Sequence, residues 1–327
     1  MATYNAPFRD KNSERYMYAG RIERMIETVE QKLVLRSLVL DDYYFCEGQE
    51  TVENKDNGNW TEFPEGARWG APEYYCRFKH SFTVPEEFKG GNVFYEVMPL
   101  YGSGRDGWRT SDAQFIIFAN GKLIQGCDSN HKEVLLLDNA QGGETYDMHL
   151  NAYLDKHEYR GQRVFKARIK QIDPVLWKLI FDLKTPLEIA EQYGPDDMDR
   201  VDIIKELNTA VNLLVIDGTH EELVESAKKC MDYLDANLYG KITLDVTTSG
   251  IGHTHIDVAW LWRLRQTREK AGRSFATVLK LMEEYPEYKF MSSQAQLYEY
   301  VKEDYPEVYE GIKKMVKEGR WEIEGGA

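Results

Sequence analysis

Residues 250–263 read G-I-G-H-T-H-I-D-V-A-W-L-W-R, and the pattern around this stretch predicts the fold. A strand is predicted before it, over Ile242–Ser249, and an amphipathic helix after it, over Arg268–Glu284. Short strands are also predicted over Tyr288–Met291 and Arg320–Ile323, with helical patterns between them. Strands that alternate with helices predict a largely parallel sheet covered by helices. Only two or three such units fit, so we expect the first, truncated part of a β/α domain.

The residues upstream predict a β-sandwich. Short runs rich in Phe, Tyr, Val and Ile recur between about residues 46 and 184, and turn signals interrupt them. Asn120-Gly121, between two apolar runs, is a strong hairpin signal because a type I′ turn needs positive φ at both central positions. Many short strands at close spacing are typical of two packed sheets.

Two other segments carry a helical pattern. Apolar side chains recur at three- and four-residue steps between Ser13 and Leu40, and again between Pro186 and Gly240, where Thr219 is an expected cap. The chain is therefore predicted to be a multidomain α/β protein. Its predicted parts are an N-terminal helical segment (1–45), a β-sandwich (46–184), a helical linker (185–240) and a truncated β/α catalytic domain (241–327).

Composition restricts the function classes. The 327 residues include 41 Lys+Arg and 55 Asp+Glu, a net charge of −14, and this balance argues against nucleic acid and anionic membranes as partners. The first ten residues lack a signal-peptide pattern, and no apolar run approaches the roughly 18 residues of a membrane span. The four cysteines form no CxxC pair, so we expect neither a cysteine zinc ribbon nor a disulfide framework, and a cytoplasmic location.

His253, His255 and Asp257 form the candidate metal site. In an extended chain, residues two apart project to one face. Two imidazoles and a carboxylate suit Zn²⁺ or a similar metal, with a further ligand expected from elsewhere. The alternative is a pair of hydrogen-bonded histidines that closes a strand end. Trp260 and Trp262 follow this group. Each either stacks on a sugar ring or belongs to the hydrophobic core, and their spacing alone favours the core.

Residues 252–262 resemble the first catalytic motif of glycoside hydrolase family 38, the class II α-mannosidases, and most resemble its cytosolic and bacterial branch. The likeness is dense from about Leu244 to Ala327. It continues through Thr267-Arg268-Glu269-Lys270, Tyr285-Pro286-Glu287-Tyr288, Ser292-Ser293-Gln294-Ala295-Gln296-Leu297-Tyr298 and Gly319-Arg320-Trp321-Glu322.

The resemblance implies a retaining α-mannosidase that acts on the terminal α-mannosides of oligosaccharides with the help of Zn²⁺, or of another divalent ion such as Co²⁺. It implies that His255 and Asp257 are metal ligands and that Trp260 lies beneath the mannose ring. His253 is then expected beside the ligand pair, where it orients one of its members, or as an alternative metal ligand. It also implies a homo-oligomer in the full-length protein.

The family's remaining catalytic groups are expected beyond Ala327. They are the nucleophilic Asp, which is also a zinc ligand, the acid/base carboxylate and the last zinc-binding His. Retaining hydrolysis needs two carboxylates about 5–5.5 Å apart. We therefore expect no catalytic residue within this chain and no turnover by it alone.

Two other functions remain open. In an amidohydrolase-like metal hydrolase, an H-x-H after a first strand also holds metal, so His253 and His255 would be the ligand pair. In a non-catalytic carbohydrate-binding protein, the sandwich would hold the sugar. Loss of metal on substitution of His253 would favour the first, and mannoside binding that survives deletion of Lys241–Ala327 would favour the second.

Overall fold

The computed structural model describes residues 14–50, 58–98, 113–128, 131–154, 164–194, 196–239, 241, 248–260 and 262–324. It contains two antiparallel sheets, a short parallel sheet and helices, which confirms the prediction of a mixed α/β chain. The chain divides into two compact units. We call residues 1–36 with 171–247 the helical unit, and residues 37–170 with 248–327 the mixed unit.

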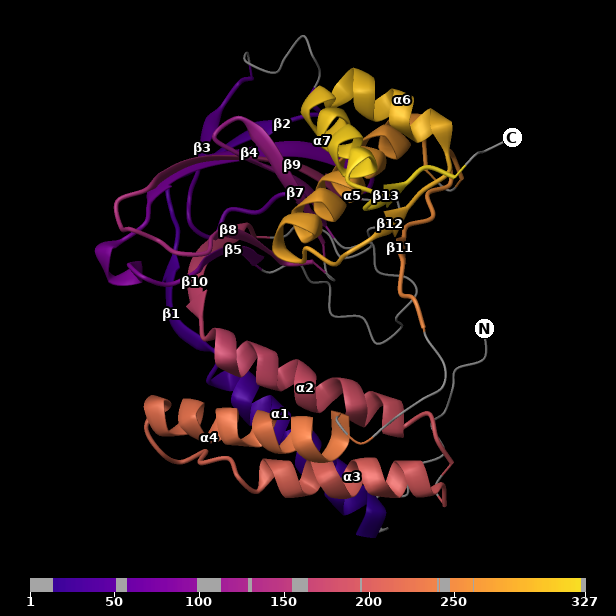
Figure 1. Ribbon diagram of the computed structural model, residues 1–327. Coiled ribbons are helices and arrows are strands. Elements are labelled where there is room, and N and C mark those ends of the chain that lie inside the picture. The colour runs from indigo at the N-terminus through magenta and orange to yellow at the C-terminus, as the bar shows by residue number, and fades with distance from the viewer. Residues whose placement is uncertain are drawn as a thin grey trace. The chain divides into compact units, whose positions relative to one another are not determined.

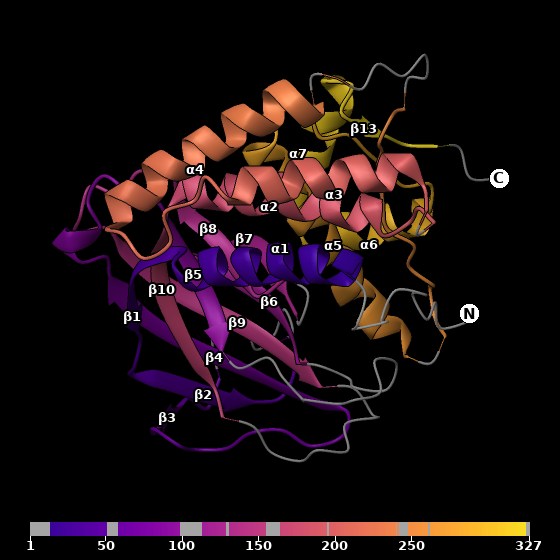
Figure 2. The same cartoon turned by 90° about the horizontal axis from the view of Figure 1, so that it is seen from below.

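The described residues of the helical unit form four α-helices, which lie side by side in Figure 1 and Figure 2. Thr219 caps α4 as predicted, because its side chain accepts from Glu222 N while the Glu222 side chain accepts from Thr219 N. A π-helical segment, Asp235–Tyr239, follows α4. The helices are α1 (Glu14–Gln31), α2 (Pro174–Ala190), α3 (Met198–Val211) and α4 (His220–Leu234).

Helix α2 corrects the predicted sandwich boundary at residue 184. Asp173 Oδ1 accepts from Val175 N at 2.8 Å and from Leu176 N at 3.1 Å, and Pro174 occupies the first turn, so a helix begins here. The buried apolar residues of this stretch form the core face of the helix, including Leu176, Leu179 and Leu183.

The first helix is shorter than its predicted range of Ser13 to Leu40. It ends at Gln31, and strand β1 (Val34–Val39) follows. The backbone here pairs with distant residues, because Asp173 N donates to Leu33 O at 3.0 Å and Leu40 N donates to Ala167 O at 2.9 Å. Local periodicity contains no information about such partners, so the prediction extended the helix too far.

The sandwich consists of two sheets with one core. One sheet has the order β3-β2-β4-β9-β6-β7 and the other β1-β10-β5-β8. Phe78 and Leu150 from the first sheet and Tyr95 and Ile169 from the second are completely buried in the same cluster. The strands are β2 (Tyr43–Glu47), β3 (Thr61–Phe63), β4 (Tyr74–Thr83), β5 (Val93–Met98), β6 (Gln114–Ala119), β7 (Lys122–Cys127), β8 (Glu133–Leu137), β9 (Thr145–Leu154) and β10 (Lys166–Ile172).

The predicted hairpin at Asn120-Gly121 is confirmed. It joins β6 to β7, which pair antiparallel, and its φ angles are 51° at Asn120 and 77° at Gly121. Both central residues are thus left-handed, as the turn requires.

The C-terminal part of the mixed unit has a short parallel sheet with helices between its strands. Its strands pair in the order β11-β12-β13, all parallel, and lie side by side in Figure 1. The predicted order of strands and helices is confirmed where it is described; the strand expected over 242–249 lies mostly outside the described residues. The elements are β11 (Gly252–His253), α5 (Leu264–Glu284), β12 (Phe290–Met291), α6 (Ala295–Asp304), α7 (Pro306–Lys317) and β13 (Trp321–Glu322).

Candidate metal and sugar site

The connection from β11 to α5 carries the predicted site. It leaves the carboxyl end of a parallel strand, which is where ligands bind in open α/β sheets. Gly252 N donates to Lys289 O at 2.8 Å, and the buried Ile256 fixes the middle of the connection. A Cβ on Gly252 would lie 2.1 Å from the Tyr288 hydroxyl oxygen, so a larger residue here would require the Tyr288 side chain to move.

His255 and Asp257 lie together, as expected for residues two apart on an extended segment. His255 Nε2 is 3.1 Å from Asp257 Oδ1. Their side chains are 71% and 32% exposed, whereas Ile256 between them is buried. An imidazole nitrogen and a carboxylate oxygen are thus adjacent and reachable from solvent, and both are donor types that bind Zn²⁺.

His253 does not join this pair. Its Nδ1 donates to Met291 O, 3.0 Å away on the neighbouring strand β12. Within the described residues, no three His, Cys, Asp or Glu side chains come together as a metal site. Of the three residues expected at the metal site, only His255 and Asp257 lie together. Their donor atoms suit zinc, but a zinc site has three or four protein ligands, so these two alone do not complete one.

The two tryptophans have different environments. Trp260 is 69% exposed, so it is not a core residue, although spacing alone favoured that assignment. Trp262 is held in place: its Nε1 donates to Thr267 Oγ1 at 3.2 Å, and Lys270 Nζ lies 3.4 Å from its ring centroid. Thr267 Oγ1 in turn donates to Val258 O at 3.0 Å, which ties the connection to the first turn of α5.

A carboxylate of the sandwich also reaches this segment. Glu73 Oε1 is 2.9 Å from Arg263 Nε and 3.3 Å from Arg265 Nη2. The Arg265 guanidinium also lies over the ring of Tyr75, 4.8 Å from its centroid. Sequence reasoning missed Glu73, because nothing in a local pattern relates residues 190 positions apart.

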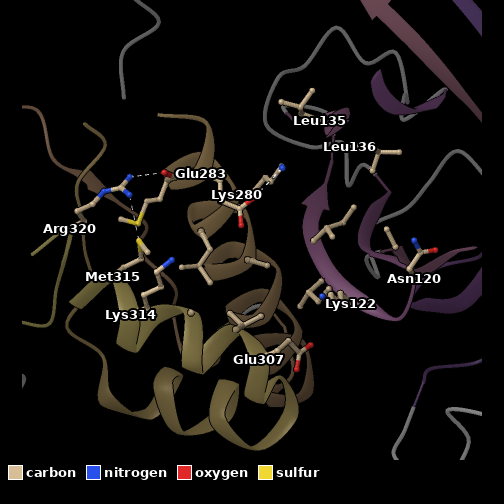
Figure 3. A pocket seen from close by; sticks show the side chains of 18 of the residues that line it. Asn120, Lys122, Leu135, Leu136, Lys280, Glu283, Glu307, Lys314, Met315 and Arg320 are labelled. Atoms are coloured by element: carbon tan, nitrogen blue, oxygen red, sulfur yellow. Dashed lines mark hydrogen bonds and ion pairs between the residues drawn. The ribbon is translucent and has the colours of Figure 1, made fainter. Parts of the chain in front are cut away.

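A large cavity lies away from this connection. It has a volume of about 870 Å³ and lies between α5 and α7 on one side and strands β6, β7 and β8 on the other (Figure 3). Its lining combines apolar side chains with charged ones, which are Lys122, Lys280, Glu283, Glu307, Lys314, Glu318 and Arg320. It contains none of the predicted site residues, so cavity size does not mark the site.

A smaller cavity of about 340 Å³ lies where α5 meets the sandwich and contains a perturbed carboxyl. Burial raises the pKa of Glu269 from 4.5 to about 7, although the amide of Gln49 donates to its Oε1 at 2.5 Å. Arg273 and Arg265 partly oppose this effect through their positive charge. The carboxyl therefore titrates near neutral pH inside the mixed unit.

One protein family and several known proteins match this chain. Residues 245–327 match the family described as "Glycosyl hydrolases family 38 N-terminal domain". Alpha-mannosidase G of Dictyostelium discoideum is 26% identical over 269 residues, covering 76% of this chain and 23% of that protein. Alpha-mannosidase 2C1 of Homo sapiens is 26% identical over 280 residues, covering 80% of this chain and 25% of that protein.

An alpha-mannosidase of Saccharomyces cerevisiae is 35% identical over 99 residues, which cover 27% of this chain and 9% of that protein. The chain thus spans about a quarter of the length of the Dictyostelium and human relatives. None of the helices in the described ranges is long and apolar enough to cross a membrane.

Proposed function

We propose that this chain, which belongs to glycosyl hydrolase family 38 through residues 245–327, supplies the first part of an active site that hydrolyses terminal α-mannosides of oligosaccharides. The observation that carries the proposal is the placement of His255, Asp257 and the exposed Trp260 on one connection within the matched segment. The relatives' names include the word mannosidase, which supports mannosides as the substrate class.

His255 and Asp257 would hold Zn²⁺, or another divalent ion such as Co²⁺, together with ligands from outside the described residues. When bound, such an ion supplies Lewis-acid charge to sugar hydroxyl groups. Binding replaces the contact between the two side chains, because His255 Nε2 cannot offer a proton to Asp257 and a lone pair to a cation at the same time.

Trp260 would provide an apolar platform for the sugar. A pyranose ring has an apolar face that stacks on aromatic rings, and the exposed indole has the free surface that this requires. Trp262 does not, since Lys270 already covers one face of its ring. We assign the nucleophile and the acid/base to none of the described residues, and we keep a cytoplasmic location and a homo-oligomeric state as predictions.

Cobalt binding by the 327-residue chain tests the metal assignment. Adding Co²⁺ and following its visible absorption should show weak binding. That binding should fall about tenfold or more in His255→Ala and in Asp257→Asn, because loss of even a group that only orients a metal ligand costs about 10–100-fold in affinity. His253→Ala serves as the matched control and should retain binding. Loss of binding in His253→Ala with retention in Asp257→Asn would instead support the amidohydrolase-like hypothesis.

Hydrolysis tests the substrate class. A protein that joins this chain to the rest of the family 38 domain should release the aglycone from an aryl α-mannoside, and a chelator should abolish that activity. Activity that resists the chelator would contradict the metal assignment. A metal-loaded protein that cleaves amides and not mannosides would contradict the proposed reaction.

A further inference from the structure

Helix α5 packs on the sandwich through a polar stripe. Arg265, Glu269, Arg273 and Thr277 are four residues apart, and residues at this spacing share one face of a helix. All four have partners or close neighbours in the six-stranded sheet or in the connections at its edge, as described below. The stripe begins one residue after α5 starts, so it lies next to the candidate site.

The far end of the stripe is attached to β7. Gly126 N donates to Thr277 Oγ1 at 3.1 Å. A Cβ on Gly126 would lie 2.8 Å from Arg273 Cβ, so the helix approaches the strand backbone directly. In the middle of the stripe, Gln49 donates to Glu269. These contacts position the body of α5 and do not touch the connection that carries His255 and Trp260.

The near end of the stripe is different, because Glu73 contacts residues on both sides of the point where α5 begins. Arg263 precedes the helix and Arg265 is its second residue. One carboxylate binds both guanidinium groups, with Arg263 Nη2 also donating to Glu73 Oε2 at 3.2 Å. The junction between the connection and the helix is therefore fixed from outside the helix.

Glu73 is well suited to hold another segment in place. It directly precedes β4, whose ten residues pair in continuous register with β9, so its attachment to the sheet is rigid. Its φ of 54° is left-handed, a conformation that residues other than glycine seldom adopt and that the surrounding structure must maintain. Its side chain is only 28% exposed, whereas that of Arg263 is 66% exposed.

We propose that Glu73 is a positioning residue, which holds residues 258–260 and 262–263 so that the Trp260 indole stays presented to solvent at the site. The segment then has two attachments, Glu73 from the sandwich and the Trp262–Thr267–Val258 hydrogen bonds from α5. The link to sugar recognition rests on the proposed function; the positioning itself does not.

Hydrogen–deuterium exchange on the 327-residue chain tests the positioning. Glu73→Gln should speed exchange of the amides from Val258 to Arg263 by about fivefold or more, because local opening becomes easier. Thr277→Val, which removes a contact at the far end of the same stripe, is the matched control and should leave those amides unchanged. Glu73→Asp keeps the charge and should restore part of the protection.

Several outcomes would overturn the proposal. One is exchange in Glu73→Gln that equals wild type at residues 258–263; another is an increase spread evenly over α5 and the sandwich, which would mean a structural role only. If Glu73→Gln does not fold, Arg263→Gln breaks the same contact from the other side and should give the same local increase, and its failure to do so would equally refute the positioning.

A sugar readout separates this proposal from the proposed function. In a protein that joins this chain to the rest of the family domain, Glu73→Gln should raise KM for an aryl α-mannoside more than it lowers kcat, since Trp260 binds sugar and does no chemistry. Wild-type protein without mannosidase activity would contradict the proposed function and leave the exchange result standing. Active protein with an unchanged KM in the variant would contradict the link to sugar binding.

Discussion

Glu269 offers a quantitative test of how α5 packs on the sandwich. Burial raises the pKa of its carboxyl to about 7, against 4.5 for an ordinary glutamate. Between these two values the folded chain keeps the carboxyl protonated while the unfolded chain ionises it, so unfolding releases a proton. The free energy of unfolding must therefore fall as pH rises from about 4.5 to about 7, and this contribution must level off above pH 7.

The pKa difference sets the size of the effect. One pKa unit corresponds to about 1.4 kcal/mol, so keeping Glu269 ionised in the folded chain costs about 3 kcal/mol at pH 8. Glu269→Gln removes the ionisation and retains an acceptor for the amide of Gln49. The stability of the variant relative to wild type should therefore increase by about 2 to 3 kcal/mol between pH 5 and pH 8.

Urea unfolding of both proteins at several pH values measures this difference. Glu299→Gln is the matched control, because the Glu299 side chain is 58% exposed on α6 and lies outside this interface. A difference between Glu269→Gln and wild type that stays constant from pH 5 to pH 8 would refute the reasoning. So would a decrease, since it would mean that the ionised carboxylate stabilises the interface.

Four other predictions follow from single contacts. His80, hydrogen-bonded to Tyr95 at 2.8 Å, has a pKa lowered to about 3 by burial, so acid should destabilise the mixed unit below about pH 6.5, and His80→Gln should reduce that loss in urea titrations at pH 4 to 7. Gly121→Ala should lower the free energy of unfolding, measured in urea, by about 1 kcal/mol; the cost comes from the positive φ of 77° alone, because no atom crowds the added methyl. A neutral effect would contradict the type I′ turn. Thr219→Ala should lower the free energy of unfolding by about 1 kcal/mol because it removes the α4 cap. Thermal unfolding followed by the circular dichroism of the helices measures this loss. Trp321→Ala should lower the free energy of unfolding by about 3–5 kcal/mol, since the ring is buried among aromatic side chains. The mixed unit of the variant should therefore be cleaved faster by a protease, and an unchanged rate of cleavage would contradict that core.

Sequence patterns predicted what local chemistry determines. Asn120-Gly121 needs only its own backbone preferences, and the order of strands and helices after residue 250 follows from hydrophobic periodicity. The contact of His255 with Asp257 follows from the alternation of an extended chain. These features could be predicted because each depends on residues within a few positions of one another.

Features that depend on distant partners were not predictable in this way. Strand β1 is determined by backbone pairing across more than a hundred residues. The cap that begins helix α2 is local, and the prediction missed it. Glu73 meets Arg263 only because a strand end and a helix start are brought together by the fold. Trp260 looked like a core residue on spacing, and the family resemblance supplied its assignment to the site; its exposure agrees with that assignment.

The shared core of the mixed unit affects where the chain can be cut for expression. Ile116, Phe118 and Leu123 of the sandwich are buried in the same cluster as Phe275 and the other apolar residues of the β/α part. A fragment that starts near residue 241 would lose this apolar support, and a sandwich without residues 241–327 would expose it to water. Either fragment invites aggregation that imitates or hides sugar binding, so recombinant products should keep residues 37–324 together and separate functions by point substitution.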